Sequence, residues 1–341
     1  MTVPRILGLG HAVPAATRGN EDPIFDWLKA HPVQGKDLFA GYDTRHVLAP
    51  DQGLIDIMVP AAQLAMDRAG VTADDIDMVL GEGSIAEFNT PNTISELHQR
   101  LGLPRHAWPV PLGNTFSQFN AGVMMADALI RAGRARHVLL ALGDNWTHYV
   151  DYATPQSVSA ADGAAACVIG PGGTAAQWEF VDQLTIADTS YYGSMFMAPQ
   201  RLAGHMNDTG EHPVLLEDMG KFSHPFFSIT QKGIDGFTQF GVNTAPEAVT
   251  TLLEKNGVAA KDICLITHQA STKLMEHWRD VINPGCYVET IAKYANLVEC
   301  SVLFNLSWGM QNAAHFTQDW LVTLCLGPDM HANAMLMRRN C

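Results

Sequence analysis

The sequence predicts an α/β protein made of two duplicated halves that stack in α/β/α/β/α layers about a pseudo-twofold axis. Two observations predict this fold class: an internal repeat at a nearly constant offset, and the same order of helix and apolar strand in both copies. Helix-then-strand units that follow one another form parallel strands joined by right-handed crossovers. The chain has 341 residues, 47% of them hydrophobic, which is enough to bury a core of this size.

The first repeated block comprises 63–84 and 250–271, and the alignment superposes Gly70 on Gly257. In each copy an amphipathic helix ends at a glycine able to adopt positive φ, a short polar turn follows, and then comes a buried strand. Chance similarity is the alternative interpretation, and a second block at nearly the same offset disfavours it.

That second block comprises 117–144 and 301–329, each a helix that leads into an apolar strand ending in glycine. A turn-rich break near 170–173 separates the two copies. We therefore predict an N-terminal half over 1–172 and a C-terminal half over 173–341.

One segment, about 186–240, has no counterpart in the first half and is interpreted as an insertion. It is rich in Met, His and Phe and has many turn-forming residues. Such a segment either caps or lines a pocket, or forms a solvent-exposed loop. Its histidines do not follow the spacing of a known metal-ligand pattern, so we predict no metal site. The histidines concerned are His205, His212 and His224.

Composition argues against several function classes. The net charge of −14 argues against general nucleic-acid binding, although it leaves room for a local basic patch that binds an acidic carrier protein or the phosphates of CoA. There is no run of about 18 apolar residues, so we expect no membrane span, and the N-terminus shows no secretory signal. Six cysteines are scattered without a CxxC pair, which is typical of reduced thiols in a cytoplasmic protein.

The sharpest candidate for chemistry is His268, which follows the apolar strand DICLIT at the point where a helix begins. Ligands bind at this carboxyl edge of open α/β sheets. The repeat places Gly81 at the equivalent position of the first half, so only one copy carries a side chain suited to catalysis there. The alternative is that His268 caps the following helix.

The segments around this histidine resemble those of a known family. HQAST, which begins at His268, resembles the His-Gln-Ala-Asn box of β-ketoacyl-ACP synthase III enzymes, and KYANLVECSV resembles their Tyr-Gly-Asn box, with the asparagine at Asn296. ILGLGHAVPAATRGNED, GYDTRHVLAPD and LGPDMHANAMLMRR resemble the family's first strand and loop, its Gly-Ile-x-x-Arg segment, and its closing turn and last strand. The resemblance runs the full length and implies the thiolase fold.

In that family a cysteine at the N-terminus of a buried helix attacks an acyl thioester, and the histidine and asparagine hydrogen-bond the thioester carbonyl of malonyl-ACP as it loses CO₂. This chain departs from the pattern, because no cysteine occurs over 1–166. Counting back from the following helix places the cysteine position at Phe116, and counting forward places it at Thr115. Ser117 is the best replacement nucleophile and Thr115 the second, while the alternative for Ser117 is a helix N-cap.

Two further departures concern the oxyanion hole and CoA. The family's Gly-Gly-Gly turn supplies a backbone N–H to the oxyanion hole, and its counterpart over 327–329 has Pro328 at the centre, which has no N–H. The Trp and Arg that family members use for the CoA nucleotide fall at Gly35 and Phe39. We therefore do not expect free acyl-CoA to bind in the usual manner.

Together these residues predict a ketosynthase III-like acyltransferase with Ser117 as nucleophile, His268 as its base and Asn296 as a carbonyl-orienting donor. Its substrate would be a pantetheine thioester, acyl-ACP or acyl-CoA, used without a further cofactor in starter-unit or acyl transfer of secondary metabolism. The alternative is a catalytically degenerate subunit that pairs with an active paralogue. By resemblance we expect a homodimer, or a heterodimer with such a paralogue, and an interface near 79–92.

Overall fold

The computed structural model describes both halves of the chain. None of the helices it describes is long and apolar enough to cross a membrane. The described residues are 3–88, 90–113, 116–172, 178–198, 226–312 and 316–339.

A five-stranded sheet forms the core of the N-terminal half, with the strand order β1-β7-β6-β4-β5. β4 runs parallel to β5 and β6, whereas β7 is antiparallel to β6 and β1. β6 and β7 are apolar and almost wholly buried, as central strands covered on both faces require. The strands are β1 (Pro4–Ala12), β4 (Met78–Ser84), β5 (Trp108–Pro111), β6 (Val138–Asp144) and β7 (Gly163–Pro171).

The C-terminal half has a second sheet of the same design, with the strand order β12-β11-β13-β14-β8. One residue pair, Ile6 with Trp178, joins β1 to β8 and makes the two sheets continuous. The strands are β8 (Trp178–Ala187), β11 (Ile263–Thr267), β12 (Cys286–Val288), β13 (Trp320–Gly327) and β14 (His331–Arg339).

The duplication predicted from the sequence is present in the strand order and register. The two orders coincide when β1, β4, β5, β6 and β7 are matched to β8, β11, β12, β13 and β14, and matched pairs share their parallel or antiparallel sense. Leu80 pairs with Leu140 in the first half. Thr267 pairs with Leu324 in the second. These are equivalent positions of the sequence repeat, so each half keeps the same register.

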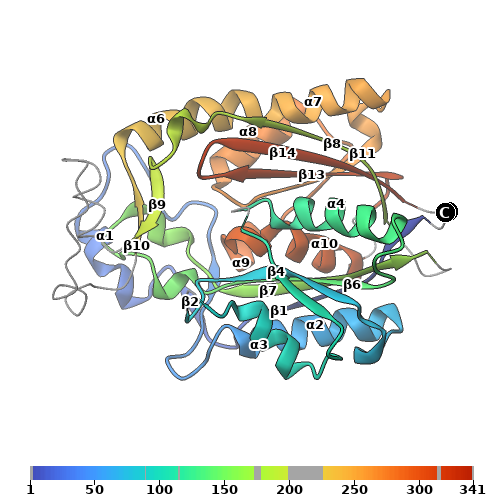
Figure 1. Cartoon of the computed structure of the whole chain (residues 1–341). Helices are drawn as coiled ribbons and strands as arrows, with labels where there is room; N and C mark the ends of the chain where they lie inside the picture. The colour runs from blue at the N-terminus through green and yellow to red at the C-terminus, as the bar shows by residue number, and fades with distance from the viewer. Residues whose placement is uncertain are drawn as a thin grey trace.

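Helices complete the α/β/α/β/α layers, which Figure 1 shows edge-on. α2 and α3 cover one outer face, α7 and α8 cover the other, and α4 and α10 lie in the layer between the sheets. α2 and α7 both end at a left-handed glycine, Gly70 with φ 66° and Gly257 with φ 65°, as the repeat predicts. The helices are α2 (Ile55–Ala69), α3 (Thr93–Arg100), α4 (Gln118–Arg131), α7 (Ala245–Asn256), α8 (Thr272–Ile282) and α10 (Ser301–Gln311).

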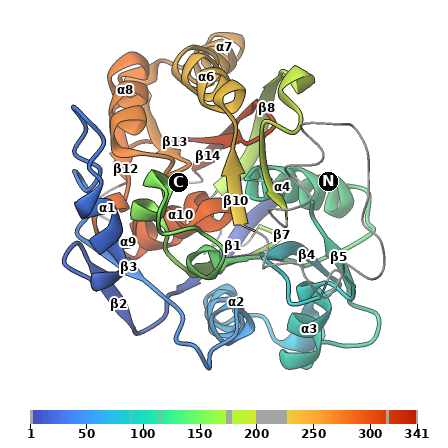
Figure 2. The same ribbon diagram turned by 90° about the vertical axis from the view of Figure 1, so that its left-hand side faces the viewer.

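Smaller elements gather at one end of the layers, the end that faces the viewer in Figure 2. β9 and β10 form a separate antiparallel pair there, contributed by the segment interpreted as an insertion. The remaining elements are β2 (Thr17–Gly19), α1 (Asp26–Ala30), β3 (Thr44–His46), β9 (Met195–Ala198), β10 (Phe226–Ile229), α6 (Gln231–Gln239) and α9 (Ile291–Tyr294).

Part of the sequence prediction falls outside the described residues. The proposed boundary between 172 and 173 lies between β7 and β8, and 173–177 are among the residues not described. Within the part of the chain that the structure describes, no group of His, Cys, Asp and Glu is arranged to hold a metal ion. The histidines weighed as metal ligands, His205, His212 and His224, also lie outside the described residues.

Candidate active site

A cleft of about 2190 Å³ is lined by segments of both halves. The described part of the insertion contributes Met195 from β9 and Phe227 from β10 to its wall. The volume exceeds that of an ordinary small-molecule pocket, so the cleft has room for an extended substrate. The lining residues that carry polar or aromatic groups near the predicted site are Phe116, His268, Asn296 and Asp329.

His268 follows β11, where the sequence placed it, and its backbone N–H continues the sheet by donating to the Leu324 carbonyl at 2.8 Å. Its side chain is buried yet reaches the cleft. Burial lowers the pKa of His268 to about 4, and a backbone contact with Val298 offsets part of the shift. The imidazole is therefore neutral at physiological pH. Ser271 caps α8 with its hydroxyl, so His268 is not the cap of that helix.

Asn296 lies on the same cleft wall, after the short helix α9. Its Oδ1 accepts a hydrogen bond from the Val298 N–H at 2.8 Å, which leaves the amide N–H groups as the part available to a ligand. The flanking backbone is unusual, because Ala295 has φ 52° and Val298 has φ 47°. Non-glycine residues at positive φ cost about 1–3 kcal/mol and persist where surrounding contacts fix them, often at functional sites.

Gln269 connects the two cleft residues, and sequence reasoning had not given it a role. Its Nε2 donates to the Ala295 carbonyl at 2.6 Å, and its Oε1 accepts from the Thr290 N–H at 2.8 Å. Gln269 is fully buried, so these hydrogen bonds are shielded from water. The residue after the histidine thus holds the loop that carries the asparagine. The only sequence signal was its place in the HQAST box.

Phe116 occupies the position in front of His268. It has φ 71°, in the turn that leads into α4, and its ring stacks on the imidazole with centroids 5.0 Å apart and planes 9° apart. The counting that runs back from α4 places the family's cysteine at this residue. An aromatic ring therefore lies where a nucleophile would face the histidine.

Ser117, the predicted nucleophile, does not contact His268. It stands at the N-cap position of α4, but its side chain makes no capping hydrogen bond. Its Oγ lies 2.6 Å from Nε2 of His331, and the side chain is fully buried. The structure therefore brings His268 and Asn296 together at the cleft and directs Ser117 elsewhere. Thr115, the second candidate, lies outside the described residues.

A second histidine thus enters the site, one that sequence reasoning missed. Nδ1 of His331 lies 2.5 Å from Oδ1 of Asp329, two residues earlier in the turn between β13 and β14. The hydrogen bond to His331 lowers the pKa of Asp329, so this carboxyl is ionised at neutral pH. Asp329 and its neighbour Pro328 line the cleft. The only sequence signal was an Asp-x-His spacing directly after the glycine turn.

The start of α4 is anchored to β4 by Gln118, whose Nε2 donates to Glu82 at 2.7 Å. Glu82 and the buried Asp144 both line the cleft. Burial raises the pKa of each of these carboxyls, and Asp144 is further raised by neighbouring carboxylates. The polar contact from Gln118 fixes the turn that carries Phe116 and Ser117.

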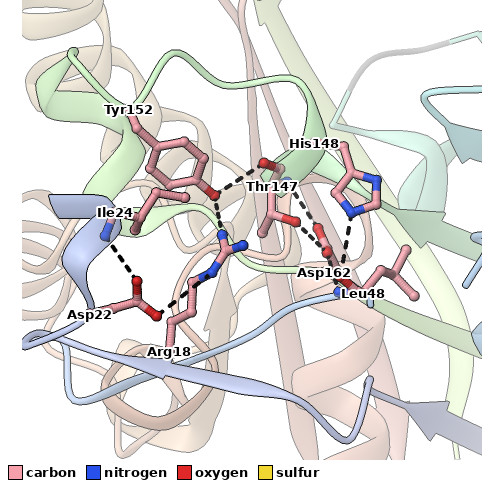
Figure 3. A network of polar contacts seen from close by, with 8 residues as sticks. All are labelled: Arg18, Asp22, Ile24, Leu48, Thr147, His148, Tyr152 and Asp162. Atoms are coloured by element: carbon pink, nitrogen blue, oxygen red, sulfur yellow. Dashed lines mark hydrogen bonds and ion pairs between the residues drawn. The ribbon is translucent and has the colours of Figure 1, made fainter. Parts of the chain in front are cut away.

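Asp162, a buried residue, holds the segment after β6 through the polar contacts that Figure 3 shows, and Trp146 and His148 of this segment line the cleft. Asp162 accepts hydrogen bonds from the Leu48 N–H at 2.7 Å and from the Thr147 N–H at 2.9 Å. The Tyr152 hydroxyl donates to the Thr147 carbonyl at 3.1 Å and accepts from Arg18 at 2.6 Å. The network ties the N-terminal segment to this wall.

Comparison with known proteins shows which proteins this chain resembles. Residues 113–188 match the sequence profile described as 3-oxoacyl-[acyl-carrier-protein (ACP)] synthase III. The chain is 26% identical over 310 residues to the β-ketoacyl-[acyl-carrier-protein] synthase III of Thiobacillus denitrificans, an alignment that covers 89% of this chain and 88% of the relative.

Solved structures show the same fold. The 3-oxoacyl-(acyl carrier protein) synthase III of Pseudomonas aeruginosa superposes with a TM-score of 0.80 at 23% identity over 98% of each chain. The priming β-ketosynthase of the R1128 polyketide pathway superposes with a TM-score of 0.81 at 19% identity, over 99% of this chain and 96% of that one. In sequence and in its duplicated layers, the chain is therefore similar to β-ketoacyl-ACP synthase III proteins.

Proposed function

We propose that this chain binds acyl groups carried as pantetheine thioesters, on acyl carrier protein or CoA, and transfers them in a starter-unit or acyl-transfer step of secondary metabolism. The observation that carries the proposal is the joint position of His268 and Asn296 on one cleft wall, tied together by Gln269. The relatives named as synthases of acyl-carrier-protein substrates and the priming ketosynthase support this substrate class.

His268 and Asn296 suit the chemistry of a thioester carbonyl. A neutral imidazole can donate one hydrogen bond to the carbonyl oxygen, and the amide of Asn296 can donate another. Both groups are held by the fold before any substrate arrives, so they stabilise the negative charge that develops on this oxygen without reorganisation. His268 can donate this hydrogen bond without being doubly protonated, which agrees with its lowered pKa.

Ser117 is the nucleophile that we propose in place of the family's cysteine. It stands at the N-cap of α4, where the helix dipole favours negative charge on an attacking oxygen. A serine ester is a poorer acyl donor than a thioester, so simple acyl transfer suits this residue better than Claisen condensation.

One observation favours a second candidate function. The Phe116 ring stacks on His268, so no nucleophile faces the histidine in this arrangement. A catalytically degenerate subunit that pairs with an active ketosynthase paralogue would need the fold and the cleft but no nucleophile. We retain this alternative because the same experiment separates it from the enzyme.

The experiment is a thiol-release assay with a panel of acyl-CoA and acyl-carrier-protein thioesters. We expect turnover of at least one thioester, and a loss of about 10²–10³-fold in His268→Ala and in Asn296→Ala, the usual effect of removing one carbonyl-stabilising donor. His277→Ala is the matched control, because His277 lies on α8 and bonds the Val242 carbonyl outside the cleft. Absence of thiol release for every thioester would favour the degenerate subunit.

A further inference from the structure

We propose that Ser117, His331 and Asp329 form a hydrogen-bonded relay. Ser117 is the nucleophile, His331 is its base, and the Asp329 carboxylate positions that base. The relay is separate from the pair His268 and Asn296. The inference rests on the proposed acyl transfer, because it names the group that activates the serine. Its three residues lie in line, with Oγ to Nε2 at 2.6 Å and Nδ1 to Oδ1 at 2.5 Å.

The direction of both hydrogen bonds follows from the ionised carboxylate. Asp329 can only accept, so Nδ1 of His331 carries the proton and donates it. In a neutral imidazole the other nitrogen is then an acceptor, so the Ser117 hydroxyl donates to Nε2. This is the arrangement in which an imidazole removes the proton of an attacking serine.

The turn between β13 and β14 is built to hold the imidazole. The Met330 N–H donates to the Gly327 carbonyl at 3.1 Å and closes the turn that contains Asp329. A Cβ on Gly327 would lie 2.0 Å from Cε1 of His331, so only glycine leaves room for the ring. The side chain of His331 is buried, which protects its bond to Ser117 from competition by water.

Access from the cleft passes through the residues that cover Ser117. The cleft wall at this point is formed by Phe116, Pro328 and Asp329, the chain neighbours of Ser117 and His331. Asp329 is half exposed, so one end of the relay already meets the cleft. Ser117 itself is buried and does not line the cleft, so the relay requires the Phe116 ring to leave its stack on His268 before a thioester carbonyl can reach the serine. In the proposal Phe116 is therefore the gate.

Acylation of Ser117 needs only the thioester and the three residues of the relay. Ser117 Oγ forms a bond to the thioester carbonyl carbon and passes its proton to Nε2 of His331. The C–S bond then breaks, and the leaving pantetheine sulfur takes that proton, so the products are an acyl ester on Ser117 and a free thiol. A hydroxyl, amine or thiol acceptor reverses the sequence and releases the acyl group.

A fluorophosphonate probe tests the relay without any thioester. An activated serine displaces fluoride and keeps the phosphonyl group, which intact-protein and peptide mass measurements locate. We expect labelling of Ser117, faster in Phe116→Ala, and a labelling rate about 10²–10⁴-fold lower in His331→Gln. Ser307→Ala is the matched control: Ser307 is also buried and lies 2.9 Å from Nδ1 of a histidine, His11, which has no carboxylate partner among the described residues.

Asp329→Asn separates a positioning role from a structural one. Asp329 is half exposed, so the variant should fold, as a thermal unfolding measurement would confirm. We expect a lower labelling rate in Asp329→Asn, and a rate restored towards the wild-type value in Asp329→Glu, which keeps a carboxylate. An unchanged rate in Asp329→Asn would overturn the assignment of Asp329.

Failure of this inference is distinguishable from failure of the proposed function. Thioester turnover with no fluorophosphonate labelling, or with labelling that His331→Gln leaves unchanged, overturns the relay and leaves acyl transfer standing. Labelling of Ser117 that depends on His331, without turnover of any thioester, supports the relay and overturns the substrate class. Absence of labelling even in Phe116→Ala overturns the relay.

Discussion

At the residue scale, the chemistry of the site depends on which side chain just before α4 faces His268. Phe116 has φ 71°, a conformation that a bulky residue adopts only where its surroundings fix it. The stack on the imidazole and the anchoring of Gln118 to Glu82 both fix this turn. The strained backbone therefore directs the side chain of residue 116 into the cleft and that of residue 117 toward His331.

Phe116→Cys tests this geometry by gain of function. The substitution places a thiol in front of His268, at a helix N-terminus that lowers thiol pKa values. We expect rapid alkylation of the new thiol by iodoacetamide, and one acyl group on residue 116 with acetyl-CoA or an acyl carrier thioester when Phe116→Cys is combined with Ser117→Ala, both measured by intact-protein mass. Ser117→Ala alone is the control, because it has neither nucleophile. Absence of acylation in the double variant would contradict the assigned geometry.

The sequence was sufficient for part of this site. The position of His268 at the end of an apolar strand predicted its place at the cleft, and the box around Asn296 predicted its partner. Counting placed the family's cysteine at Phe116 or at Thr115, and Ser117 was the best replacement nucleophile close to both. Which side chain faces His268 depends on backbone conformation, which composition does not reveal. His331 lies in a buried strand two residues after Asp329, where a histidine normally indicates packing, so its contact with Ser117 depends on tertiary structure alone.

At the element scale, the repeat makes Gly81 and His268 equivalent, but β4 continues beyond Gly81 to Ser84, whereas β11 ends at Thr267, just before His268. Gly81 has φ 144°, and a Cβ there would lie 1.8 Å from the Ala141 carbonyl oxygen. The equivalent position in the second half carries His268. The close approach of the β6 backbone therefore leaves no room for a side chain at this position of β4. At the equivalent position after β11, the His268 side chain reaches the cleft.

Gly81→Ala should therefore destabilise the fold far more than Gly70→Ala. Both glycines have positive φ, but a Cβ on Gly70 meets no atom within 4 Å. We expect a loss of about 2–4 kcal/mol for Gly81→Ala and about 1 kcal/mol for Gly70→Ala in urea unfolding. Equal losses would show that the close approach of β4 and β6 is not rigid.

Helices and strands of the repeat were predictable because each copy shows its period and its glycine cap. The separate pair β9 and β10 was not, because the segment 186–240 alternates turn formers with large apolar residues and has no copy to compare. Its described residues line the cleft because Met195 and Phe227 pack toward it, a contact that no local pattern specifies.

At the scale of the whole molecule, an edge strand indicates where a second subunit would bind. β5 ends the N-terminal sheet, and its Trp108 is 65% exposed. Phe88, which lies within the predicted interface segment 79–92, is 57% exposed. Large exposed apolar residues at a sheet edge favour pairing with another chain. We expect a dimer by light scattering at micromolar concentration, and a monomer for Trp108→Glu. A monomeric wild-type chain would contradict this assembly.

The central claim is that an acyl group is transferred to Ser117 from a pantetheine thioester that binds in the cleft of His268 and Asn296. The most direct test is to incubate the chain with acyl-CoA and acyl-carrier thioesters, measure intact mass, and locate the modification by peptide mapping. We predict one added acyl group on the peptide that contains Ser117, absent in Ser117→Ala and retained in Ser307→Ala. No added mass with any thioester, or an acyl group on another residue, would contradict the account.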